Sequence, residues 1–213
     1  MDEEIAIIDE LTRREKITNF LIKNKKKVYL VLILILVTLF LIFYLSDVKE
    51  KKKIELSNIF INASINYTAE NKNDYLNIFK NIIEKNDSTY SPLALFFIID
   101  NKLLVSNEEI NPLIDRVIKN SRLENEIKNL IIYKKALINF EFVNEKDLIE
   151  ILNPIINSES IWKPHALLLL GDYFLSKDEK NKAQESFNRI LIIKNGDQNI
   201  LFQAQTRLRN INE

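Results

Sequence analysis

The sequence contains no cysteine and a single histidine, His165, among its 213 residues. Without cysteine there is no thiolate nucleophile, no disulfide and no thiolate ligand for a metal. A lone histidine also removes almost every site in which several imidazoles bind one ion. A lipid anchor attached to an N-terminal cysteine is excluded for the same reason. These absences argue against most metal-dependent and thiol-dependent chemistry.

Glycine and proline are also rare, at two and four residues. Average usage is near 7% for glycine and 5% for proline. So few turn-forming residues cannot supply the tight turns of a β-sandwich or of a Rossmann sheet. Two glycines are likewise too few for a glycine-rich phosphate loop. We therefore expect an all-α protein.

Neither sign of charge is in excess, because Lys and Arg number 30, as do Asp and Glu. Nucleic-acid-binding proteins usually carry a basic excess, so we expect no nucleic-acid partner. The sequence has no G-x-S-x-G, P-loop or HExxH motif. Acidic pairs such as Glu108-Glu109 fall in expected turns and helix starts, where they favour the helix dipole. We expect no enzymatic activity, no cofactor, no metal and no small-molecule substrate.

A long apolar run is present near the N-terminus. Residues 28–45 are eighteen consecutive uncharged residues, all of them Val, Leu, Ile or Phe except Tyr29, Thr38 and Tyr44. As a helix the run is about 27 Å long, close to the roughly 30 Å of hydrocarbon in a bilayer. Its fifteen aliphatic and Phe residues contribute about −5 to −9 kcal/mol to insertion. The run predicts a transmembrane helix with a tyrosine near each membrane interface.

Two other interpretations of this run are possible, a buried core helix and a cleaved signal peptide. A core helix is rarely flanked by lysine clusters, and the run is flanked by Lys23, Lys25, Lys26 and Lys27 before it and by Lys49, Lys51, Lys52 and Lys53 after it. A signal peptide has a shorter apolar region followed by small residues of the A-x-A kind. Residues 44–48, YLSDV, offer no such site. We expect an uncleaved anchor at 28–45.

Basic residues before the anchor predict its orientation. They are Arg13, Arg14, Lys16, Lys23, Lys25, Lys26 and Lys27. Short basic flanks remain in the cytoplasm, whereas charges in long domains count less. We expect 1–27 to be a cytoplasmic amphipathic leader, with Ile5, Ile8 and Leu11 on one stripe, and 46–213 to be exported. A reversed topology with a cytoplasmic domain is the alternative.

The expected exported part contains a repeated helical pattern. Apolar residues at i, i+3, i+4, i+7 and i+8 mark one face of a helix. Four such runs are Tyr75/Ile78/Phe79/Ile82/Ile83, Ile110/Leu113/Ile114/Val117/Ile118, Leu148/Ile151/Leu152/Ile155/Ile156 and Ala183/Ser186/Phe187/Ile190/Leu191. Their starts lie 35, 38 and 35 residues apart, close to the period of tetratricopeptide arrays.

Each run predicts the second helix of a pair. The expected pairs are 49–69 with 73–86, 91–105 with 108–120, 123–142 with 146–157, and 163–175 with 179–194. Twelve residues before each run lie Ala63, Ile98, Ala136 and Gly171, and three of these four are small enough for close helix packing. We expect Gly196 to end the last pair as a left-handed residue. A final amphipathic helix with Ile200, Leu201, Ala204, Leu208 and Ile211 would close the stack.

Residues 165–191, HALLLLGDYFLSKDEKNKAQESFNRIL, resemble a tetratricopeptide repeat. Gly171 stands at the expected helix crossing, Phe174 follows it, and Ala183 and Phe187 lie in the second helix, although Asn195 replaces the usual closing proline. The acidic-then-basic leader DEEIAIIDELTRREK, the single anchor and the degenerate array together resemble the YfgM family, the ancillary subunit of the bacterial SecYEG translocon. The resemblance covers nearly the full chain. It implies a right-handed α-solenoid in the periplasm, held by a single-pass anchor in the bacterial inner membrane.

The repeat register predicts a protein-binding groove. First helices of stacked pairs line a concave surface that suits peptides or partner helices. With Gly171 fixing the register, the groove residues are Tyr133, Leu137 and Phe140 from the third pair and His165, Leu168 and Asp172 from the fourth. The alternative is that Tyr133, Leu137 and Phe140 belong to the core.

Two functions from different classes fit these features. The first is an accessory protein of the Sec translocon and periplasmic chaperone network, with translocon subunits, a periplasmic chaperone or unfolded exported chains as partners, as the family resemblance implies. The second is a structural adaptor for envelope assembly or cell division that holds one folded partner on the same surface. Localisation separates them, because a division adaptor concentrates at the septum.

Overall fold

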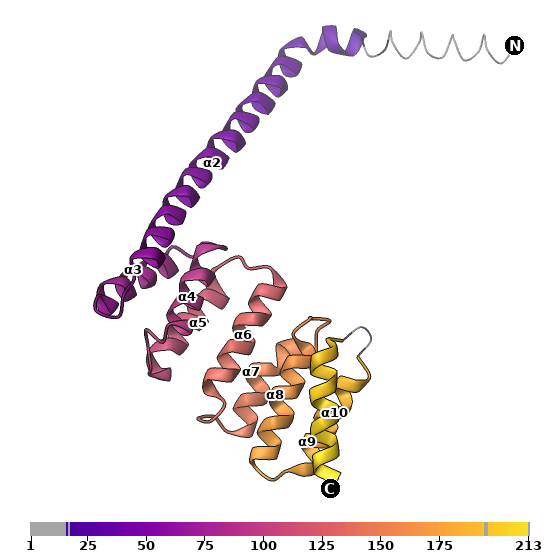
Figure 1. Cartoon of the computed structure of the whole chain (residues 1–213). Helices are drawn as coiled ribbons and strands as arrows, with labels where there is room; N and C mark the ends of the chain where they lie inside the picture. The colour runs from indigo at the N-terminus through magenta and orange to yellow at the C-terminus, as the bar shows by residue number, and fades with distance from the viewer. Residues whose placement is uncertain (1–15, 17, 194–195, 213) are drawn as a thin grey trace, which may run out of the picture. The chain divides into compact units, whose positions relative to one another are not determined.

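The computed structural model describes residues 16, 18–193 and 196–212, and all regular structure in this part of the chain is helical. The helices are α2 (Lys25–Asn66), α3 (Lys72–Glu84), α4 (Tyr90–Asp100), α5 (Asn107–Asn120), α6 (Asn125–Asn139), α7 (Glu145–Ile156), α8 (Lys163–Ser176), α9 (Lys180–Leu191) and α10 (Gln198–Asn212) (Figure 1). The predicted all-α class is confirmed. Most of the expected leader, residues 1–15 and 17, lies outside the described residues, and so does its stripe of Ile5, Ile8 and Leu11.

Contacts divide the chain into two units, one reaching Glu55 and the other beginning at Leu56. In the first unit the apolar part of α2 is long and apolar enough to cross a membrane, and none of it is buried by protein. Its one central polar side chain, Thr38, donates a hydrogen bond to the carbonyl oxygen of Ile35 over 2.8 Å. This bond pairs the hydroxyl proton of Thr38 within the helix, as a lipid environment requires.

The expected break after the apolar run is absent. We predicted an anchor at 28–45 and a separate helix from residue 49, whereas α2 is continuous from Lys25 to Asn66. No glycine or proline occurs between the two segments. Asp47 and Lys51 form an i,i+4 ion pair of 2.8 Å across the junction, which favours the helix further. The prediction of two separate helices was therefore wrong.

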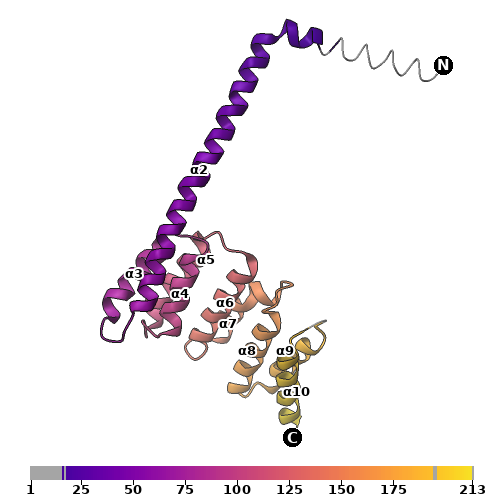
Figure 2. The same ribbon diagram turned by 45° about the horizontal axis from the view of Figure 1, so that its top comes forward.

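In the second unit, helices α3 to α10 lie side by side in chain order (Figures 1 and 2). Every helix from α3 to α9 packs on its successor. Next-but-one neighbours also touch in three cases, α3 with α5, α6 with α8, and α8 with α10. The predicted positions of these helices are confirmed to within a few residues at each end. The second unit is therefore held together by contacts between helices that are close neighbours in the sequence.

The core of this unit consists of two apolar clusters that meet at α6. Ile131 belongs to the cluster formed with α3, α4 and α5, and Ile132 to the one formed with α7, α8 and α9. Nearly all residues of the four predicted apolar runs are buried or half-buried. Leu191 is the exception, with 38% of its surface exposed, because α9 ends there and α10 begins only at Gln198.

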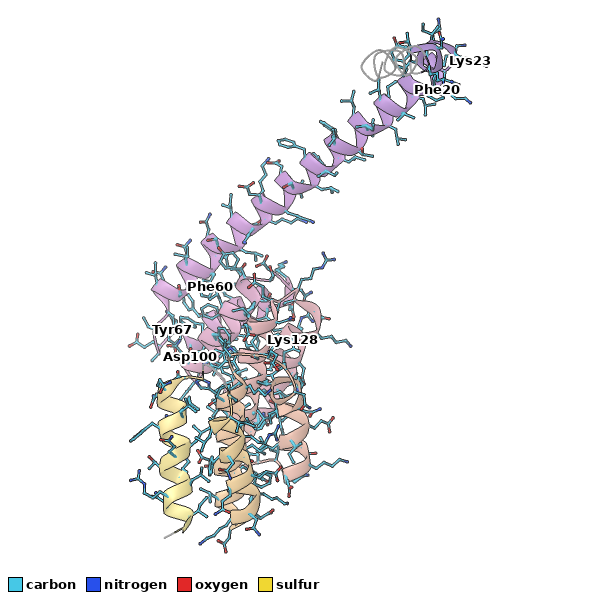
Figure 3. The ribbon with its side chains drawn as sticks, turned by 90° about the vertical axis from the view of Figure 1, so that its right-hand side faces the viewer. Phe20, Lys23, Phe60, Tyr67, Asp100 and Lys128 are labelled. Carbon is cyan, nitrogen blue, oxygen red and sulfur yellow. The ribbon has the colours of Figure 1, made fainter. Side chains whose placement is uncertain are left out.

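An aromatic cluster packs the last turns of α2 against α3 and α4. The Phe60 ring lies 6.0 Å from Phe79 and 6.1 Å from Tyr90, and the Tyr67 ring lies 5.4 Å from Phe97. Figure 3 shows Phe60 and Tyr67 directed toward the neighbouring helices. Ala63, between them in sequence, is 3% exposed. Small and aromatic residues together let this part of α2 act as the first helix of the row.

Several helices end in the left-handed conformation without glycine. Lys102 after α4 has a φ of 51° and Asp178 after α8 a φ of 61°. In each case the next residue closes the helix by donating to a carbonyl five positions back, Leu103 to Ile98 over 2.9 Å and Glu179 to Phe174 over 2.8 Å. These are Schellman ends. Polar residues therefore stop these helices, at some cost in strain, since side chains other than glycine disfavour this conformation.

Gly196 does not end the last pair as predicted. Helix α9 ends at Leu191, with Ile192 as its cap at a φ of −90°. The backbone N–H of Ile193 donates to the carbonyl of Ile190 over 3.1 Å, which closes the last turn without a left-handed residue. Asn195 lies outside the described residues. The prediction was wrong because a tightened final turn satisfies the helix end before Gly196 is reached.

Gly171 allows α8 and α9 to approach closely. A Cβ atom built on Gly171 would lie less than 3.0 Å from three carbons of the Phe187 ring, a distance that real Cβ atoms do not show. Phe187 is completely buried. The predicted crossing of the two helices at Gly171 is confirmed.

The last helix closes the row as expected. Ile200 and Ala204 are buried at 6% and 0% exposure, and Leu201, Leu208 and Ile211 are partly buried against the same core. The opposite side of α10 carries exposed polar residues, Gln198, Asn199, Gln205, Arg209 and Asn210, with Phe202, 63% exposed, as the one large apolar side chain among them. A single exposed ring on a polar side is not a continuous apolar stripe on which a further helix could stack.

We expect Gly171→Ala to lower the free energy of unfolding by about 1–3 kcal/mol, because overpacking a filled core displaces buried side chains. The gain of about 1 kcal/mol from replacing a helical glycine by alanine offsets only part of the strain. Chemical unfolding of the full chain in detergent, followed by far-ultraviolet circular dichroism, measures the change.

Gly196→Ala is the matched control. The atoms nearest to its new Cβ would lie at 3.6 Å or more, so its stability should change by less than about 0.5 kcal/mol. Equal stability of Gly171→Ala and the natural chain would contradict the close crossing of α8 and α9.

Candidate protein-binding surface

Side-chain contacts join α4, α6, α8 and α10 into one surface, which we call the first-helix face. Between α4 and α6, Lys134 pairs with Asp100 over 2.8 Å and lies 5.4 Å from the centre of the Phe96 ring. Between α6 and α8, the Tyr133 and His165 rings lie 5.9 Å apart. Between α8 and α10, Asp172 pairs with Arg207 (α10). Three of the predicted groove residues, Tyr133, His165 and Asp172, therefore take part in contacts that continue across four helices.

Three rings form a cluster at the start of α8. Trp162 stacks on Tyr133 at a centroid distance of 5.9 Å and an interplanar angle of 23°. The ring of His165 lies 5.2 Å from Trp162 and meets the Tyr133 ring edge-on at 73°. The His165 Nδ1 atom is buried and forms no hydrogen bond within the described residues. The structure thus brings together two predicted groove residues, Tyr133 and His165, and adds Trp162.

Asp172 is engaged by α10 and is not a free carboxylate. Arg207 donates from Nε to Oδ1 and, over 3.0 Å, from Nη2 to Oδ2. A guanidinium bound through two nitrogens is held in a fixed geometry and binds more strongly than one with a single contact. Both side chains keep 31% of their surface exposed. Asp172 therefore fixes the position of α10 and also places a paired charge on the first-helix face.

The pKa of Tyr133 lies above its usual value near 10. Burial of the hydroxyl is the larger cause, and the negative charge of Asp172 is the smaller one, because both disfavour the tyrosinate anion. Tyr133 and Asp172 therefore share one electrostatic environment although they belong to different helices.

The other predicted groove residues differ in their accessibility. Leu137 is 45% exposed, whereas Leu168 is 8% exposed and belongs to the core. Phe140 is partly buried, with its ring 5.7 Å from Tyr173. Tyr133 and Phe140 thus pack against the core from one side, as the alternative interpretation held, and Leu137 remains available for contact.

Sequence reasoning missed Trp162, Lys134 and Arg207. Trp162 is the only tryptophan and stands just before the predicted helix, so its amphipathic ring was a detectable signal. Lys134 and Arg207 could not be identified as readily, because many basic residues occur in the chain and their acidic partners lie about one repeat away. Pairing between repeats depends on helix register, which composition does not reveal.

An open cavity of about 940 Å³ adjoins the ring cluster. Its lining includes Trp162, His165, Lys163 and Arg189, together with Ile161 and Ile192. The lining is therefore aromatic and aliphatic, with two basic side chains and two acidic ones, Glu159 and Asp197, at the same site. Among the residues that the structure describes, no cluster of acidic residues or histidine is arranged to hold a metal ion.

Comparison of the chain with protein-family models, with curated proteins and with solved structures found no match. Any function must therefore be argued from the surfaces of the molecule itself.

We expect Asp172→Asn to lower the pKa of Tyr133 without returning it to 10, since burial, the larger cause, remains. Because the folded-state pKa is raised, the unfolded chain ionises first, and the stability that this tyrosine contributes is lost as pH rises above about 10. Titration of the tyrosine ring carbons by NMR, assigned with Tyr133→Phe, measures the pKa.

Glu145→Gln is the control for this titration, because Glu145 pairs with Lys182 over 2.8 Å between α7 and α9. That variant should leave the Tyr133 titration unchanged. An unaltered pKa in Asp172→Asn would show that Tyr133 does not sense the charge on α8.

Proposed function

We propose that this protein is a single-pass membrane protein whose helical-repeat unit binds other proteins on the first-helix face. In the proposal the repeat unit lies outside the cytoplasm and serves the Sec translocon and the periplasmic chaperone network. The observation that carries the binding proposal is the series of contacts that makes α4, α6, α8 and α10 one surface.

The anchor part of the proposal is supported by α2. Its apolar run is uncovered, with Leu36 at 65% and Phe43 at 75% exposure. Burial of such side chains is favourable by about 1.5–3 kcal/mol each, and a bilayer supplies that burial along the whole run. The basic residues that precede the run favour an N-terminus in the cytoplasm.

The repeat part is supported by contacts between residues about one period apart. Hydrogen bonds join Lys134 to Asp100 and Ser160 to Glu126 at a separation of 34 residues, and Arg207 to Asp172 at 35. Corresponding positions of successive repeats meet in this way when helix pairs stack in register. Together with the crossing at Gly171, this spacing favours a tetratricopeptide-like solenoid, with the right-handed stacking typical of that architecture.

The protein-binding part is supported by the chemistry of the first-helix face. Aromatic rings, an exposed leucine and paired charges are the mixture that protein interfaces use, with aromatic and arginine residues enriched at their centres. Leu137 lies on α6 between the Lys134 pair and Phe140, and is open to solvent. The face suits an apolar segment of a partner helix or of an unfolded exported chain.

We expect Leu137→Asp to weaken partner binding by about tenfold, because the proposal makes Leu137 one of the few central residues whose loss costs more than about 1 kcal/mol. The stability of the variant should change by no more than about 0.5 kcal/mol, because Leu137 is exposed. Photo-crosslinking from position 137 of the full chain in native membranes identifies the partner.

Ile149 on α7, 37% exposed, is the matched control outside the first-helix face. Adducts should form from position 137 with translocon subunits, periplasmic chaperones or newly exported chains, and not from position 149. Absence of such adducts from position 137, or equal labelling from both positions, would overturn the proposed function.

A further inference from the structure

The loops that join each helix pair to the next lie along one edge of the second unit (Figure 1), which we call the pair-joining edge. These loops are α3–α4, α5–α6 and α7–α8, and Ile192 and Ile193 after α9 border the same cavity as the α7–α8 loop. Helix α2 enters the unit at the same edge, because Phe60 contacts Tyr90, the first residue of α4, and Tyr67 contacts Phe97 near the end of α4. The last turns of α2, which belong to the second unit, therefore run parallel to α4 from the pair-joining edge.

This edge carries a group of exposed apolar side chains, which we call the edge patch. Ile161 and Ile192 keep 68% and 79% of their surface exposed. Both line the cavity of about 940 Å³ together with Trp162, so the three residues lie around one opening. Single exposed isoleucines are common, but two of them beside the only tryptophan form an apolar patch of the kind that marks an interaction site.

The chain length limits how far this edge can lie from the end of the apolar run. The ten residues 46–55 separate Leu45 from Leu56 and span at most about 35 Å even when fully extended. The opposite edge lies one helix length farther from the point of entry, about 21 Å for a helix of the length of α8. Because the connecting segment 46–55 is this short, the pair-joining edge has a high effective concentration at the surface in which residues 28–45 are held.

We propose that the edge patch contacts the surface of the lipid bilayer that holds α2. This inference rests on the anchor in the proposed function. Tryptophan prefers the boundary between headgroups and acyl chains, and Ile161 and Ile192 extend the apolar contact there. Lys163 and Arg189 line the same cavity and are suited to lipid phosphates, although Glu159, which pairs with Lys163 over 3.8 Å, and Asp197 line it as well.

The place of the edge patch favours lipid over a protein occupant. Ile161 and Ile192 lie in loops at the edge where the chain enters, and Trp162 stands where this edge meets the first-helix face, stacked on Tyr133. Val105 and Phe142, in the α4–α5 and α6–α7 loops at the opposite edge, are exposed to 85% and 75%. They provide a matched apolar control that the proposal places away from the membrane.

Trp162 reports on this contact directly because it is the only tryptophan in the chain. In vesicles that contain the full chain, we expect lipids brominated near the headgroup to quench Trp162 fluorescence. Ile161→Glu combined with Ile192→Glu should abolish the quenching, whereas Val105→Glu combined with Phe142→Glu should leave it unchanged. All four positions are largely exposed, so circular dichroism should show each variant folded.

A second reporter separates failure of the contact from failure of the anchor. Phe40→Trp in a Trp162→Phe background places the reporter in the apolar run, where lipids brominated deep in the acyl chain should quench it. Quenching of this reporter without quenching of Trp162 would overturn the edge contact alone. No quenching of either reporter would overturn both the anchor and the contact. Quenching of Trp162 that survives in the Ile161/Ile192 double variant would overturn the contact alone.

Discussion

Eighteen consecutive uncharged residues in α2 have no protein surface to cover them in the described part of the chain. The hydrophobic effect makes this the dominant constraint on the molecule, because each uncovered aliphatic side chain is worth about 1.5–3 kcal/mol on burial. The proposed anchor follows from satisfying that constraint with a bilayer, and the proposed contact of the edge patch with lipid rests on that anchor. The helical repeats alone would be compatible with any compartment.

Packing between close neighbours determines what the second unit can do. Each helix is held by the next one along the chain, and the sites of closest approach, such as Gly171 against Phe187, lie within one pair. Such a row buries its apolar stripes without closing on itself, so an extended face remains for partners. Paired side chains such as Asp172 and Arg207 fix one pair relative to the next, and the same contacts give the face its chemistry.

Helix positions were predictable because the spacing of apolar residues and the positions of polar clusters indicate the same helix boundaries in this chain. Apolar residues recur at helical spacing, and clusters of polar residues interrupt them, so α3 to α10 were placed from the sequence. The continuity of α2 was missed because the lysine cluster suggested a boundary, while the local ion pair of Asp47 and Lys51 favours helix. At the candidate site, register placed Tyr133 and His165 on one face, but it could not show that Leu168 is buried or that Arg207 holds Asp172. Those facts depend on helix rotation and on a partner 35 residues away.

Extraction of native membranes with alkaline carbonate, followed by intact mass measurement of the chain, tests the central claim most directly. The account predicts that the chain stays in the membrane pellet and that its mass includes residues 28–45. Recovery of the chain in the soluble fraction, or a mature chain that begins after Leu45, would contradict it.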